Sequence, residues 1–185
     1  MTNRIYNYTA FYVDTPFSES NLGARATHDF CYYNMLKLWK ATESAFPFQD
    51  AHEKTYNVRD NSTWDTLKNR LHERLNLSKN IVLVLSSVTK NSRALREEIE
   101  YGVGKLGLPV IVIYPELDNT DIATNGKLNN NVLSPYWDKL PAFRDLLNTI
   151  PSFHVPCKKA YISSALKDPD VTIQHKKEIA KYFYA

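Results

Sequence analysis

Three glutamates lie close together on one predicted helix, and their spacing separates them around its circumference. Glu97, Glu98 and Glu100 share this helix with Leu95 and Ile99, which define its apolar side. At about 100° of rotation per residue, Glu97 and Glu100 point well away from the apolar stripe, whereas Glu98 lies on its border. Glu98 is therefore the acid that can face the edge of an adjoining sheet, where a carboxylate could stabilise positive charge on a ligand. Composition alone favours a different arrangement, a solvated acidic face near the helix start.

The helix belongs to a predicted strand, helix, strand unit that spans residues 80–116. Its two strands, 81–85 and 110–114, are short apolar runs rich in β-branched residues, which is typical of strands buried on both faces of a parallel sheet. Open α/β sheets bind ligands at the carboxyl ends of their strands. Ser86 and Ser87 follow the first of these strands, so both are candidates for ligand contact.

Strands and helices alternate along the rest of the chain. We therefore expect one α/β domain over residues 1–185, with a doubly wound parallel five-stranded sheet in the flavodoxin-like order 2-1-3-4-5. In that order the crevice lies between strands one and three, and the loop that begins at Asp14 lines it. The predicted strands are 8–13, 54–58, 81–85, 110–114 and 153–155, and the predicted helices are 27–44, a helix from Ser62 that includes Leu75, 91–106, 136–147 and 170–184.

Other segments carry weaker signals. Residues 118–134 are rich in Asn and Asp, and we expect a mobile loop, a lid or an interface there. Cys31 and Cys157 have apolar or aromatic neighbours and are expected to be buried free thiols. The five histidines show no metal-ligand spacing; His154 is expected in the core and His72 on the exposed side of its helix. No metal site is predicted.

Several functional classes are disfavoured by the sequence. The formal charge of +3 is spread along the chain, with no basic stripe, so nucleic acid is not the expected partner. Neither a GxGxxG nor a GxxxxGK[ST] motif is present, which argues against dinucleotide oxidoreductases and nucleoside triphosphatases. A receiver domain would need an Asp where this chain has Ser86 and Ser87. No apolar leader and no stretch of transmembrane length is found, so we expect a cytoplasmic protein without a membrane partner.

The order of motifs between Asp60 and Ile113 resembles the Toll/interleukin-1-receptor-like (TIR-like) domains of bacteria, in particular the small TIR-like proteins of Thoeris-type antiphage systems. Those families share an acid after the second strand, a Trp-bearing helix, an apolar strand that ends in Ser, and a glutamate eleven residues beyond that Ser. The matching residues here are Asp60, Trp64, the strand 81–85, Ser87 and Glu98.

This resemblance implies an enzyme that cleaves the nicotinamide glycosidic bond of NAD and makes an ADP-ribose-derived signal for a downstream effector. NAD would be the substrate, and no further cofactor is expected. Glu98 would supply the carboxylate that stabilises the cationic ribosyl centre. The other candidates for substrate contact are two aromatic residues that could stack on a ring and four polar or acidic residues: Tyr12, Phe17, Asp14, Asp60, Ser86 and Ser87.

Two alternatives stay open. Many TIR enzymes carry an aromatic residue, and often a Cys, a few positions before the glutamate, whereas this chain has Ala94 and Leu95. That departure favours a non-catalytic scaffold that acts by self-association. A flavin-binding electron carrier has the same architecture and would be yellow when purified.

Overall fold

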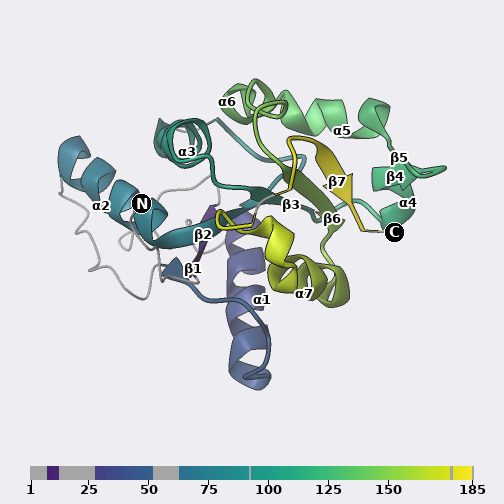
Figure 1. Cartoon of the computed structure of the whole chain (residues 1–185), viewed down its shortest axis with the longest axis horizontal. Coiled ribbons are helices and arrows are strands. Elements are labelled where there is room, and N and C mark those ends of the chain that lie inside the picture. The colour runs from purple at the N-terminus through teal and green to yellow at the C-terminus, as the bar shows by residue number, and fades with distance from the viewer. Residues whose placement is uncertain (1–7, 13–27, 52–62, 92, 176, 185) are drawn as a thin grey trace.

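The structure is a computed structural model that describes residues 8–12, 28–51, 63–91, 93–175 and 177–184. Its centre is a sheet of five parallel strands in the order β1-β2-β3-β6-β7 (Figure 1). The strands are β1 (Tyr8–Tyr12), β2 (Ser78–Val84), β3 (Val110–Tyr114), β6 (Ser152–Pro156) and β7 (Lys181–Phe183).

The three central strands are buried on both faces. Residues 81–84 of β2 and all of β3 and β6 are buried. Alternate residues of β2 enter two separate cores: Ile81 and Leu83 pack into the first, and Val82 and Val84 into the second. The continuous apolar runs in the sequence reflect this two-sided burial, as predicted.

Helices cover both faces of the sheet (Figure 1). On the side of the first core lie α2 (Trp64–Leu77), α3 (Arg93–Ile99) with its π-helical continuation η3 (Glu100–Lys105), α5 (Asn130–Trp137) and α6 (Pro141–Arg144). On the side of the second core lie α1 (His28–Thr42) and α7 (Lys159–Lys167). None of the helices in the described part of the chain combines the length and the apolar character needed to cross a membrane.

The strand order agrees with the prediction where the two can be compared. The strands predicted as first, third, fourth and fifth are neighbours in that order, whereas the predicted second strand, 54–58, lies outside the described residues. The predicted closing helix over 170–184 is wrong. This segment contains the 3-10 turn η4 (Pro169–Val171) and the edge strand β7, in which Tyr182 stacks on Phe153 with ring centroids 5.0 Å apart. Aromatic residues suit an edge strand that packs on one face, and this preference outweighs helical propensity.

We expected the Asn-rich segment 118–134 to be a mobile loop, a lid or an interface; it contains regular elements, so the loop is wrong, whereas the lid and the interface stay predictions. The segment forms α4 (Asn119–Ile122), β4 (Ala123–Thr124), β5 (Lys127–Leu128) and the first half of α5. A capping box between Asp118 and Asp121 starts α4. Asn125 and Gly126 have φ values of 53° and 72°, which suit the tight turn of a two-residue hairpin. The abundant Asn and Asp residues therefore serve as caps and turns.

Helix α1 has nearly the predicted length but a different buried face. The expected face included Cys31, Met35, Leu38, Trp39 and Thr42, yet Cys31, Leu38 and Thr42 are exposed. Tyr33 and Leu36 of α1 are buried in the second core, and Tyr32, Met35 and Trp39 are partly buried and pack against it. Consequently Cys31 is not the buried thiol that was predicted, while Cys157 is partly buried and the pKa of its thiol is raised to about 11 by that burial.

Candidate functional site

Helix α3 carries the three glutamates and starts after the turn that follows β2. Leu95 and Ile99 are fully buried against the sheet and fix the rotation of the helix. Glu98 is 6% exposed, whereas Glu100 at the start of η3 is exposed. The sequence-based expectation that Glu98 turns inward agrees with its burial.

Glu97 does not face solvent freely, and that part of the prediction is wrong. One oxygen of its carboxylate lies 3.0 Å from Lys68 Nζ and 2.9 Å from His72 Nε2, both on α2. Partial burial acts to raise the pKa of Glu97, but the hydrogen bonds from His72 and Lys68 outweigh it and leave this pKa below its ordinary value. The Glu97 side chain is therefore an ionised link between two helices. His72, expected on the exposed side of its helix, is partly buried in this link.

Glu98 lies where α3 comes close to α2 and the sheet. One turn further along the same side of the helix is Gly102, where an added Cβ would lie 2.7 Å from side-chain methyl carbons of both Leu75 and Ile81. Burial raises the pKa of Glu98 well above its ordinary value, and the positive charge of Arg74 on α2 opposes this rise. A cation bound beside Glu98 would favour its ionised form for the same reason.

The contacts between α2 and α3 form a continuous row, which we call the α2–α3 seam. The guanidinium of Arg93 lies 3.9 Å from the ring centroid of Trp64 at the beginning of the two helices. Next comes the Glu97 link, and then Tyr101, whose ring stacks on His72 at a centroid distance of 3.5 Å and an interplanar angle of 9°. Asn76 Nδ2 donates to Tyr101 Oη at 3.2 Å. Spacings of four residues on both helices build the seam: Trp64, Lys68, His72 and Asn76 on α2, and Arg93, Glu97 and Tyr101 on α3 and η3.

Ser86 and Ser87 form the turn between β2 and α3. Ser86 is buried, and its backbone N–H donates to Thr89 Oγ1 at 2.9 Å. Ser87 is exposed; its backbone N–H and its hydroxyl both donate to the carboxylate of Glu116. Tyr136 Oη donates to the same carboxylate at 3.1 Å. Glu116 thus links the turn after β2 to the segment after β3. The sequence analysis did not select Glu116, although its position just beyond the apolar run of β3 could have identified it as a candidate.

Comparison with known families bears on these elements directly. The model of the family described as Thoeris protein ThsB, TIR-like domain, matches residues 8–120, which is more than half of the chain. The chain belongs to the ThsB TIR-like family. The match covers β1, α2, β2, α3 and β3, and therefore includes Glu98, the seam and the Ser86 and Ser87 turn.

The remaining site predictions fall at the first strand of the TIR-like domain and beyond it. Tyr12 is the last residue of β1 and pairs with Leu83 of β2, so the carboxyl ends of β1 and β2 are adjacent. Asp14, Phe17 and Asp60 lie outside the described residues. The structure thus brings the end of β1, the serine turn and the start of α3 to one edge of the sheet.

The buried histidine on β6, beyond the residues matched by the family model, is a core residue, as predicted. His154 is fully buried; its Nδ1 lies 2.7 Å from Tyr114 Oη and its Nε2 lies 3.0 Å from Ser152 Oγ. Trp137 Nε1 donates to the same tyrosine oxygen at 2.8 Å. Burial, with a smaller effect from Lys181, lowers the pKa of His154 to about 3, so the imidazole is neutral at pH 7.

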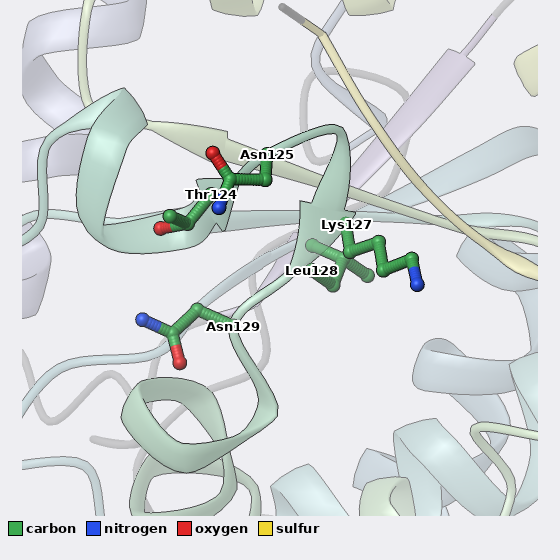
Figure 2. Close-up of a pocket in the computed structure, with 5 residues that line it drawn as sticks. All are labelled: Thr124, Asn125, Lys127, Leu128 and Asn129. Atoms are coloured by element: carbon green, nitrogen blue, oxygen red, sulfur yellow. The ribbon is translucent and has the colours of Figure 1, made fainter.

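A hollow lies away from Glu98, beside the β4–β5 hairpin (Figure 2). It is lined by Thr124, Asn125, Lys127, Leu128 and Asn129. No acidic side chain lines it, so it cannot supply a carboxylate to a cationic centre. Among the described residues, no group of three or more His, Cys, Asp or Glu side chains comes together in a way that could hold a metal ion.

Proposed function

We propose that this ThsB TIR-like domain cleaves the nicotinamide glycosidic bond of NAD and converts the remainder into an ADP-ribose-derived signalling nucleotide for antiphage defence. The observation that carries the proposal is the burial of Glu98 on α3, within the region that matches the family. Helix α3 follows the turn at the carboxyl end of β2, so an inward-facing carboxylate on this helix is a candidate for contact with a ligand at that edge.

The reaction needs one negative charge in the right place. Nicotinamide is a cationic leaving group: the C1′–N bond breaks, its electron pair leaves with the neutral ring, and an oxocarbenium-like ribosyl centre remains. Water or a hydroxyl group of the nucleotide then attacks this centre and loses its proton. A carboxylate about 4 Å from the developing cation, at an effective dielectric near 20, stabilises it by about 4 kcal/mol, or roughly a thousandfold in rate.

The pKa of Glu98 would respond to the substrate. Burial raises this pKa well above its ordinary value, and a cationic group bound beside the carboxyl would lower it and so favour the ionised form. The strongest interaction of the carboxylate would then be with the charge of the reacting ribosyl nicotinamide rather than with solvent.

The other predicted residues take supporting roles in this proposal. Ser86 and Ser87, beside the end of β1, would orient ribose hydroxyls or the nicotinamide amide, together with Asp14 and Asp60. Tyr12 and Phe17 would stack on a ring of the substrate.

The test is nicotinamide release from NAD by concentrated, purified protein. Glu98→Gln keeps nearly the same volume and removes the charge, so we expect kcat to fall by about a hundredfold or more. Glu100→Gln is the matched control, because this acid is exposed two residues away, and it should leave kcat unchanged. Parental turnover in the Glu98→Gln protein would contradict the mechanism.

A non-catalytic scaffold is the second candidate, favoured by Ala94 at a position near which many TIR enzymes carry an aromatic residue. It predicts no nicotinamide release from the parent protein and unchanged protection against phage in the Glu98→Gln variant. Loss of protection in that variant, with normal protein levels, would favour the enzyme.

A further inference from the structure

The burial of Glu98 needs a force that keeps it in place. Water solvates a carboxylate far better than a protein interior does, so an ionised Glu98 favours any motion that returns it to solvent. Rotation of α3 about its own axis is such a motion. Helix α3 has seven residues before the π-helical segment begins, and on its inner side it is anchored by Leu95 and Ile99.

The α2–α3 seam opposes this rotation from the outer side. Glu97 lies directly beside Glu98 in the sequence, and its carboxylate is held by Lys68 and His72 at 3.0 and 2.9 Å. The Glu97 side chain is only 17% exposed, so solvent screens these contacts less than it screens a pair on the open surface. One turn further along, the stack of Tyr101 on His72 holds the same side of the helix.

The two neighbouring glutamates therefore have different roles. We propose that Glu97 is a positioning residue: by linking α3 to Lys68 and His72 of α2, it holds Glu98 at its buried position between the two helices and the sheet. The catalytic consequence of this role rests on the proposed function. The positional consequence does not, because the burial of Glu98 can be measured without turnover.

The first measurement uses stability and needs no activity. Below about pH 4.5 a glutamate is protonated in both the folded and the unfolded chain, whereas at higher pH a buried Glu98 is disfavoured as an ion. Glu98→Gln should therefore raise the melting temperature more at pH 8 than at pH 4.5, and this difference reports how deeply Glu98 is buried. We then compare the gain in melting temperature from Glu98→Gln at pH 8 with the gain at pH 4.5 in a Glu97→Ala background. There the difference between the two gains should shrink to less than about half, since Glu98 can reach solvent. A Glu100→Ala background is the control and should leave it unchanged.

The second measurement uses turnover of NAD. Glu97→Ala should lower kcat by about tenfold and change KM less than about twofold. The reason is that the Glu98 carboxylate, displaced in this variant, stabilises the transition state and not the bound substrate. Glu97→Gln keeps an acceptor for His72 and Lys68 and should recover most of this loss. Glu100→Ala should match the parent in both constants.

The two measurements together distinguish a positioning role of Glu97 from a merely structural role and from direct action on the substrate. If Glu97→Ala lowers the melting temperature but leaves both the Glu98-dependent pH difference and kcat unchanged, Glu97 is merely structural and the proposal is overturned. If the pH difference shrinks in a protein that never releases nicotinamide, the positioning role stands and the proposed function fails. If the pH difference persists while kcat falls, Glu97 acts on the substrate directly and positioning is refuted.

Discussion

Glu98 illustrates how one buried carboxyl can cost stability and still serve a reaction. Because its folded-state pKa is raised, the folded chain holds a proton that the unfolded chain releases between about pH 4.5 and the raised value. Stability therefore falls as the pH rises through that window, and below it this penalty is absent. A residue kept in such a position is a candidate for function.

The fall in stability with rising pH gives a first prediction at the scale of the residue. Glu98→Gln should unfold at a higher temperature than the parent at pH 8, by a few degrees, and should show no such gain at pH 4.5. Thermal unfolding at the two pH values checks this. A loss of stability at pH 8 would mean that the carboxylate makes favourable contacts that the present geometry does not contain.

The same carboxyl sets a second prediction for the pH dependence of turnover. In the free enzyme the carboxyl must lose its proton, so kcat/KM should rise with pH up to the raised pKa of Glu98. Bound cationic substrate favours the carboxylate, so the corresponding rise in kcat should occur at lower pH. Coincident profiles for kcat/KM and kcat would show that the titrating group does not sense the substrate charge.

At the scale of the element, the two glycines of η3 differ in how closely neighbouring side chains approach them. Gly102 and Gly104 both lie in η3, yet their surroundings differ. A Cβ at Gly102 would meet Leu75 and Ile81 at 2.7 Å, whereas a Cβ at Gly104 would meet Leu146 no closer than 3.6 Å. Both methyl groups near Gly102 belong to fully buried side chains, so they have no solvent to move into.

The third prediction compares alanine at these two positions. Each substitution gains up to about 1 kcal/mol from helix propensity. At Gly102 the overpacking costs about 1 to 3 kcal/mol, so Gly102→Ala should be destabilised relative to Gly104→Ala. Urea unfolding of the two variants checks the order of stability. Equal midpoints would show that Leu75 and Ile81 repack without strain.

Elements also show what the sequence could and could not reveal. The strands β2 and β3 were predictable because continuous apolar runs need burial on two faces. The capping role of Asp118 and the tight turn at Asn125 were hidden in a segment whose composition favours a loop. The link from Glu97 to Lys68 and His72 could not be predicted, since it depends on how two helices pack, and periodicity on one helix does not determine that.

At the scale of the whole molecule, two buried titratable groups act on stability in opposite directions. His154 has a pKa lowered to about 3, so the unfolded chain binds a proton at His154 below about pH 6.5 that the folded chain does not take up. Its contribution is present above pH 6.5 and is lost as the pH falls towards 3. Just above about pH 4.5 the contributions of His154 and Glu98 change with pH in opposite directions, so they partly offset one another.

The last prediction concerns a variant that lacks the contribution of His154. In His154→Gln the loss of stability caused by protonation of His154 in the unfolded chain should disappear, so from about pH 4.5 upwards stability should fall as the pH rises, in the direction that the raised pKa of Glu98 dictates. At pH 7 the variant should be less stable than the parent, because Tyr114 and Ser152 lose their imidazole partner. His175→Gln, at an exposed histidine, is the control and should follow the parent. Urea unfolding across this range decides the matter: a parental profile in His154→Gln would mean that His154 can be protonated within the fold.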